Sequence, residues 1–121
     1  MKNKVLIIED DLITQELFKR QLSPYSDIIQ ASTLEEAENK YDDEKNITMI
    51  LVDGQLGPQP DLDEGPNTVR LTTKIRKTFK GLMIAISINE ESNKILKMIG
   101  CDYAVYKGDA VPLAIKLLST S

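Results

Sequence analysis

The stretch VLIIEDD, at residues 5–11, joins a continuous apolar run to three consecutive carboxylates. An unbroken apolar run of this length is typical of a strand that helices cover on both faces, as in a parallel α/β sheet. Three further runs also stop on polar residues: MILV on Asp53, MIAI on Ser87 and YAVY on Lys107. Ligands of open α/β sheets bind outside the carboxyl ends of the strands, so these side chains are predicted to share one crevice.

Strand-like and helix-like segments alternate along the chain. The predicted strands are residues 4–9, 27–31, 47–53, 82–87 and 103–107. Between them apolar residues recur at helical spacing, first as the pairs Ile13 with Leu17 and Phe18 with Leu22. Right-handed crossovers then favour an α/β fold of five βα units, (βα)5: a doubly wound five-stranded parallel sheet in the order 2-1-3-4-5, the flavodoxin-like architecture.

Capping residues support the predicted helices. Ser32 and Thr33 each have a glutamate three residues later, which is the signature of a capping box, and Gly100 stands where a helix would end. Asp109 is predicted to cap the last helix, because Pro112 would then fall within its first turn.

Composition limits the functions to consider. The 121 residues suit one domain, residues 1–121, and the 41% hydrophobic and 28% charged contents are ordinary for a globular protein. No apolar run approaches the roughly 18 residues of a membrane helix, and the amino terminus lacks the apolar core of a signal peptide, so we expect a cytoplasmic protein without membrane contact. A net charge of −4 argues against direct nucleic-acid binding.

Histidine is absent, and cysteine occurs once. The lack of histidine excludes Ser-His catalytic pairs, imidazole metal ligands and a phosphohistidine on this chain. Cys101 cannot form an intramolecular disulfide and is expected to be a buried, unreactive residue.

The polar strand ends together suit phosphoryl transfer. Taken singly, the acidic residues 9–11 would cap a helix, Asp53 would open a turn, Ser87 would satisfy a strand end, and Lys107 would be solvated. Taken together, three carboxylates at one sheet edge repel one another unless a cation neutralises them, and oxygen ligands favour Mg²⁺. Asp53 would be the nucleophile, with Glu9 and Asp10 completing the metal ligands. Lys107 and Ser87 would contact the phosphoryl oxygens.

These motifs resemble the CheY-like receiver domain of bacterial two-component response regulators, over essentially the whole chain. IIEDD, MILVD, AIS and GCDYAVYK match, in order, the family's acidic pair, phosphoacceptor, hydroxyl and lysine. The resemblance implies Asp53 as phosphoacceptor, Mg²⁺ or Mn²⁺ held by Glu9, Asp10, Asp53 and the backbone carbonyl of Gln55, and phosphoryl sensing by Ser87 and Lys107. It also implies that Gln55 and Asn89 tune the phosphoryl lifetime.

Several positions depart from the family pattern. Gly108 replaces the proline that usually follows the lysine, so a cis bond is not expected there. The aromatic switch residue is replaced by Ala104, with Tyr103 and Tyr106 nearby, and Tyr103 would face the opposite side of the strand. Ile88 replaces a small residue and is expected to crowd the phosphoryl pocket.

A long loop follows Asp53. Residues 54–66 (GQLGPQPDLDEGP) contain three prolines and three glycines and form a longer connection than the family usually has. Loops longer than roughly 12 residues are uncommon in compact domains and tend to be functional or disordered. Its position at the crevice favours a lid or a loop beside the metal.

The leading hypothesis is a stand-alone receiver whose Asp53 accepts phosphate from a sensor histidine kinase or a histidine phosphotransfer protein. It would signal to a protein partner through helix four, strand five and helix five, as a monomer or a phosphorylation-linked dimer. It would assist its own phosphorylation and dephosphorylation without being a multi-substrate enzyme. The alternative is an atypical receiver that docks partners independently of phosphorylation. Phosphohydrolases with an aspartate nucleophile are disfavoured because a DxD element is missing, and nucleotide carriers because the carboxylates at 9–11 would repel phosphate.

Overall fold

The computed structural model describes residues 3–57 and 66–120, which form five βα units. The strands are β1 Lys4–Ile8, β2 Asp27–Ala31, β3 Met49–Val52, β4 Leu82–Ala85 and β5 Tyr103–Ala104. The helices are α1 Leu12–Leu22, α2 Leu34–Asp43, α3 Val69–Arg76, α4 Glu90–Ile99 and α5 Lys107–Ser119. Among the described residues, no helix has both the length and the apolar character needed to cross a bilayer.

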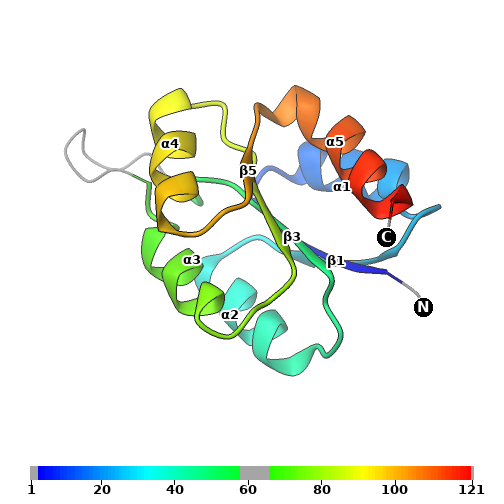
Figure 1. Ribbon diagram of the computed structural model, residues 1–121, viewed down its shortest axis with the longest axis horizontal. Helices are drawn as coiled ribbons and strands as arrows, with labels where there is room; N and C mark the ends of the chain where they lie inside the picture. The colour runs from blue at the N-terminus through cyan, green and yellow to red at the C-terminus, as the bar shows by residue number, and fades with distance from the viewer. Residues whose placement is uncertain (1–2, 58–65, 121) are drawn as a thin grey trace.

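The five strands form one parallel sheet in the order β2-β1-β3-β4-β5, which confirms the predicted topology. Helices α1 and α5 cover one face, and α2, α3 and α4 cover the other (Figure 1). The register aligns Ile8 with Ala31 and Val52, and Val52 with Ala85. The segments that follow these residues therefore leave the sheet at the same edge.

The continuous apolar runs are buried because both faces of the sheet are covered. In β1, Leu6 and Ile8 join the core beneath α2, α3 and α4, whereas Val5 and Ile7 join the core beneath α1 and α5. All four side chains are fully buried. The alternation of a strand thus supplies both cores from one apolar sequence.

Four strands, β1, β3, β4 and β5, end earlier than predicted. Pairing continues by one residue beyond each of these strands, because the next backbone N–H group still donates to a carbonyl of the neighbouring strand at 2.9–3.0 Å; the donors are Glu9, Asp53, Ile86 and Val105. Ser87 lies two residues beyond the end of β4, and Lys107 is the first residue of α5 instead of the last residue of a strand. Strand β5 is correspondingly reduced to two residues.

Of the two apolar pairs predicted for α1, Phe18 and Leu22 are buried, but the prediction was wrong for Ile13 and Leu17. Leu12, Ile13 and Leu17 are 75%, 80% and 46% exposed, and Gln15 is buried beside Phe18 and Leu22. Gln15 lies inside because its side-chain amide nitrogen, Nε2, donates to the carbonyls of Ile7, Glu9 and Ala31 at 2.9–3.1 Å. These carbonyls lie at the ends of the first two strands, where a buried polar group needs a partner.

The helix caps agree with the sequence except in α5. Thr33 caps α2 and accepts a hydrogen bond from the Glu36 N–H, and Gly100 ends α4 with φ 146°. Helix α5 begins at Lys107, so Asp109 lies in its first turn instead of capping it, and Pro112 lies inside the helix. Pro112 has no N–H to donate to the Gly108 carbonyl, four residues earlier. Gly108 is solvent-exposed in the first turn of the helix.

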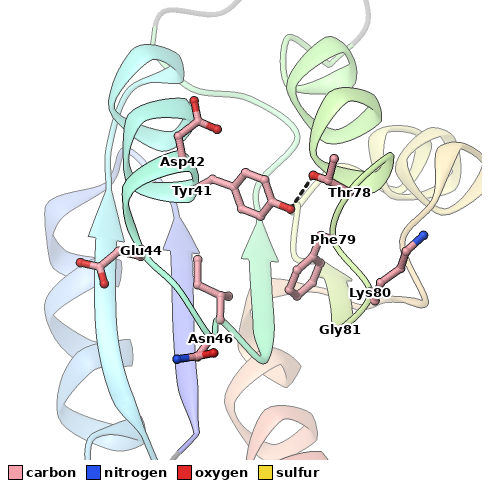
Figure 2. Close-up of a pocket in the computed structure, with 9 residues that line it drawn as sticks. Tyr41, Asp42, Glu44, Asn46, Thr78, Phe79, Lys80 and Gly81 are labelled. Atoms are coloured by element: carbon pink, nitrogen blue, oxygen red, sulfur yellow. Dashed lines mark hydrogen bonds between the residues drawn. The ribbon is translucent and has the colours of Figure 1, made fainter.

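An open pocket of about 430 Å³ lies near the amino-terminal ends of β3 and β4. The Tyr41 hydroxyl points toward Thr78 Oγ1, 2.7 Å away, and its ring packs edge-on against Phe79 (Figure 2). Because the pocket is at the edge opposite the polar strand ends, it takes no part in the chemistry predicted for them.

Candidate functional site

Glu9, Asp10 and Asp53 form an acidic cluster at the carboxyl edge of the sheet. Each offers one carboxylate oxygen, and these three oxygens lie within 4.8 Å of one another. Glu9 is fully buried and Asp53 is 5% exposed, whereas Asp10 is partly exposed. The adjacent parallel strands β1 and β3 bring the residues together, as predicted from their positions after two apolar runs.

Lys107 reaches the cluster from the first turn of α5. Its Nζ lies 2.5 Å from Glu9 Oε1 and 3.1 Å from Asp53 Oδ2. The Lys107 side chain is 22% exposed, so these ion pairs are partly shielded from water. The structure therefore joins four predicted site residues into one charged constellation.

Backbone groups fix the orientation of the carboxylates. The Gly54 N–H donates to Asp53 Oδ1 at 2.7 Å, and the Asp11 N–H donates to Glu9 Oε2 at 3.1 Å. The Gly57 N–H donates to Asp10 Oδ2 at 2.8 Å, so the first residues of the long loop contact the cluster. Residues 58–65 of that loop, on which the lid prediction depends, lie outside the described residues.

Burial and neighbouring charges act in opposite directions on the two central groups. Burial raises the pKa of Glu9 to about 7, with the Asp53 charge adding to it, although Lys107 and the Asp11 N–H favour the carboxylate. Burial also disfavours the ammonium of Lys107, but its contacts with Glu9 and Asp53 outweigh burial and raise the pKa of Lys107. Lys107 is therefore charged at neutral pH, and the buried Glu9 carboxylate is the costly charge of the cluster.

The donor set fits a hard divalent cation. Three carboxylates and one ammonium carry a net charge of −2 when all are ionised, which one divalent ion would balance. Carboxylate oxygens are the ligands that Mg²⁺ and Ca²⁺ prefer. Glu9, Asp10 and Asp53 would hold such an ion. Gln55 is half-buried next to the cluster, and a metal contact from its backbone carbonyl stays a prediction.

Ser87 is buried and lies in a hydrogen-bonded turn. Its Oγ accepts a hydrogen bond from the Asn89 N–H at 3.0 Å, and Asn89 Oδ1 caps α4 by accepting from the Ser92 N–H. Within residues 3–57 and 66–120, no hydrogen bond joins Ser87 to Asp53. Ile88 is 75% exposed, so its side chain extends into solvent instead of packing into the site.

The residues predicted for the switch region lie along β5 and the start of α5. Ala104 is half-buried and packs against the core beneath α2, α3 and α4. Tyr103 and Tyr106 are 38% and 50% exposed, and Tyr106 is the residue before α5. Neither tyrosine supplies a buried aromatic ring in place of Ala104.

Two side chains that sequence reasoning missed support the site. Thr68 is fully buried and donates from Oγ1 to the Asp53 carbonyl at 2.7 Å. Asn93 is 6% exposed and its amide contacts the backbone of Ser87. A polar residue inside a helix is normally read as solvent-exposed. The available signal was that Asn93 falls on the apolar face of α4, three residues before Leu96.

Comparison with known proteins identifies the fold. No family model and no curated protein matches the chain. Among solved structures, it is similar to a two-component response regulator from Clostridium difficile (TM-score 0.80, 21% identity, 98% of this chain and 97% of the other). It is also similar to a CheY-like receiver domain from Methanospirillum hungatei JF-1 (0.77, 20%, 99% and 96%).

A third solved structure contains a modified residue and bound groups. It is a response regulator from Burkholderia pseudomallei with a phosphorylated aspartic acid, calcium and citrate (TM-score 0.79, 18% identity, 97% of this chain and 66% of the other). At these low identities, the structural similarity establishes the fold alone. The roles of individual residues depend on the geometry described above. The chain therefore has the fold of the CheY-like receiver domains of response regulators.

Proposed function

We propose that this chain is a phosphoacceptor receiver that takes a phosphoryl group on Asp53 in a Mg²⁺-dependent reaction and signals through a protein partner. The observation that carries the proposal is the position of Asp53, whose carboxylate lies among two further carboxylates and 3.1 Å from the Lys107 ammonium. Phosphoryl transfer needs an oriented nucleophile and positive charge on the transferred oxygens, and this cluster supplies the nucleophile and the ammonium.

Each residue has a defined task in the proposed reaction. An oxygen of Asp53 forms a bond to phosphorus while the bond from phosphorus to the nitrogen of a phosphohistidine breaks, which gives an acyl phosphate and a free histidine. Glu9, Asp10 and Asp53 would hold Mg²⁺, which would neutralise charge on the phosphoryl oxygens. Lys107 pairs with one phosphoryl oxygen, and the Ser87 hydroxyl donates to another after turning from its present contact with Asn89.

Two structural neighbours support this chemistry on the same fold. The Burkholderia pseudomallei regulator contains a phosphorylated aspartic acid and a calcium ion. A receiver domain named DrrB, 17% identical over the whole of both chains, is described as activated by BeF3. The proposal carries these properties to Asp53 because the acidic cluster and Lys107 have the geometry that a metal and a phosphoryl group need.

The proposed donor is a histidine kinase or a histidine phosphotransfer protein in the cytoplasm. Leu12 and Ile13 are 75% and 80% exposed at the start of α1, next to Asp11 and the acidic cluster. Exposed apolar side chains beside a reactive group suit a protein donor better than a small molecule. Replacing both by glutamine should slow transfer from such a protein and leave transfer from acetyl phosphate unchanged, when both rates are measured on the same preparation.

Mass spectrometry of the intact chain after incubation with Mg²⁺ and acetyl phosphate tests the proposal. We expect one added phosphoryl group, sensitive to hydroxylamine as acyl phosphates are, and no addition when EDTA replaces Mg²⁺. Phosphoramidate, whose P–N bond has the chemistry of phosphohistidine, provides a second donor.

Two variants make the test specific. Asp53→Asn should remain unmodified. Asp11→Asn removes a neighbouring exposed carboxylate and keeps the helix cap, because asparagine also caps helices, and should be modified like the wild type. A folded wild-type chain that is modified by neither small donors nor histidine donors would contradict the proposal. It would favour the alternative function, a docking module that does not depend on phosphorylation.

A further inference from the structure

Asn93 connects three separate segments of the fold through one side chain. Its Oδ1 accepts a hydrogen bond from the Ser87 N–H, and its Nδ2 donates to the Ser87 carbonyl and to the Val105 carbonyl, each at 3.0 Å. The amide is 6% exposed and both of its Nδ2 protons have partners. Because Asn93 belongs to α4, it ties this helix to the segment after β4 and to the segment after β5.

These contacts replace sheet pairing where the strands have ended. Strand β4 ends at Ala85 and β5 at Ala104, yet Ser87 and Val105 must reach the edge where the acidic cluster lies. The Val105 N–H still pairs with the Ala85 carbonyl, at 2.9 Å, whereas the Val105 carbonyl pairs with Asn93. Val105 is two residues before Lys107. The side-chain amide of Asn93 therefore contacts both the backbone of Ser87, which carries the hydroxyl, and the segment that leads to the Lys107 ammonium.

The neighbouring residue of α4 packs against the other side of the site. A Cβ added at Gly54 would lie 2.8 Å from Ser92 Cβ, so the backbone that follows Asp53 is in close contact with α4. Consecutive residues in the first turns of α4, Ser92 and Asn93, therefore contact the segments that carry Asp53 and Ser87. A displacement of either segment is transmitted directly to this helix, because packed contacts of this kind do not deform continuously.

We infer that Asn93 is the positioning residue that transmits the state of Asp53 from Ser87 to α4 and β5. This inference rests on the proposed function. When Ser87 turns toward a phosphoryl group, its N–H and carbonyl move together with the Asn93 amide, and α4 and Val105 follow. A hydrogen-bonded link of this kind needs no aromatic ring at position 104, where this chain has alanine.

The test is an NMR titration of the ¹⁵N-labelled chain with Mg²⁺ and beryllofluoride, which mimics a phosphoryl group. In the wild type we expect amide shifts at Asp53 and Ser87 and also at Leu96 and Val105. In Asn93→Leu, which keeps the volume and removes the three hydrogen bonds, shifts near Asp53 and the affinity for beryllofluoride should persist. Shifts at Leu96 and Val105 should fall close to zero.

A control variant separates this role from a general loss of stability. Thr48→Val removes the hydrogen bonds that Thr48 Oγ1 makes with Lys4 at the opposite edge of the sheet, and it should keep the wild-type pattern of shifts. If Asn93→Leu shows undiminished shifts at Leu96 and Val105, the inference is wrong while the proposed function stands. If the wild type shows no shifts with beryllofluoride, the proposed function fails and the inference fails with it.

The inference is testable even if Asn93→Leu does not fold. Asn93→Asp keeps the acceptor for the Ser87 N–H and removes both donors, so it should keep local binding and lose the shift at Val105. The side-chain amide resonances of Asn93 in the wild type provide a second measurement without any substitution. They should move on addition of beryllofluoride, and resonances that stay fixed would contradict the inference.

Discussion

Gln15 is the residue whose role differs most from what its type suggests. Glutamine inside an amphipathic helix is normally solvent-exposed, yet this side chain is 6% exposed and donates to three carbonyls, while its Oε1 accepts from Gln30 Nε2 at 2.8 Å. The carbonyls belong to β1, β2 and Glu9, so Gln15 joins α1 to the strand ends beneath the acidic cluster. Gln15 stabilises the fold by donating to buried carbonyls at the strand ends, although the Ala31 carbonyl also accepts from the Glu9 N–H.

Replacing Gln15 by methionine should therefore lower the free energy of unfolding. The apolar variant keeps the length of the side chain but removes the donor to the Glu9 carbonyl and the second donor to the Ala31 carbonyl, which also accepts from the Glu9 N–H. Leaving a buried acceptor unsatisfied costs about 1–3 kcal/mol. Urea unfolding followed by circular dichroism measures the change. Gln21→Met is the matched control, because Gln21 lies on the exposed face of the same helix and should change stability by less than about 0.5 kcal/mol. Equal effects of the two substitutions would contradict this role.

Cys101 should be unreactive in the folded chain. It is 5% exposed, and burial raises the pKa of its thiol to about 12, although Arg76 nearby favours the thiolate. At about pH 8 the thiolate is then about one part in ten thousand, against a substantial fraction in an unfolded chain, whose cysteine pKa is about 8.5. Iodoacetamide labelling measured by mass spectrometry should be slow at this pH and become fast in guanidinium chloride. Fast labelling of the native chain would contradict the prediction.

The same shift of the Cys101 pKa makes stability depend on alkaline pH. Because the folded chain holds the thiol proton more tightly than the unfolded chain, the associated stability is fully present below about pH 8.5 and is lost as the pH rises toward about 12. Cys101→Ala should reduce this alkaline loss, measured as the pH dependence of the unfolding midpoint.

At the scale of elements, α4 contacts the backbone at two of the site residues. Its first turns contact the backbone after Asp53 through Ser92 and the backbone at Ser87 through Asn93. The apolar pattern of residues 82–87 predicted the strand β4 but not this helix contact. A hydrophobic period reports which face is buried, whereas the amide contacts of Asn93 depend on where two strands stop. Those two strands, β4 and β5, stop earlier than their apolar runs.

Gly54→Ala should destabilise the fold through its contact with α4. The new Cβ would lie 2.8 Å from Ser92 Cβ, and relieving such overpacking costs about 1–3 kcal/mol. Ser92→Gly removes the opposing Cβ. Gly54→Ala should therefore lower the free energy of unfolding less in the Ser92→Gly background than in the wild type. A double-mutant cycle of unfolding free energies measures this coupling. Additive effects of the two substitutions would show that the contact does not limit the packing.

At the scale of the whole molecule, the sequence predicted the sheet order and the convergence of the acidic residues with Lys107. Both depend on features that a sequence displays directly, because apolar runs mark the strands and parallel strands end at one edge. The start of α5 at Lys107 and the exposure of Ile13 were not predictable in this way. They depend on how α1 and α5 pack on the sheet, which local spacing does not determine.

Metal binding at the acidic cluster should stabilise the entire chain. A ligand that binds only the folded state stabilises it by an amount that depends on its concentration relative to Kd, about 1.4 kcal/mol at ten times Kd. The three carboxylates of the cluster are brought together only by folding, since they lie at positions 9, 10 and 53. Mg²⁺ should therefore raise the melting temperature, and an increase of several degrees is expected for a domain of this size.

Thermal unfolding followed by circular dichroism, with increasing MgCl₂ at constant ionic strength, measures this effect. Asp10→Asn should lose most of the increase, because it removes the partly exposed carboxylate of the cluster while Glu9 and Asp53 keep their ion pairs with Lys107. Asp42→Asn is the matched control, because Asp42 is an exposed carboxylate at the opposite edge of the sheet and should keep the full increase. If Asp10→Asn gains as much stability as the wild type, Mg²⁺ acts through diffuse screening of the negative chain and not through the cluster.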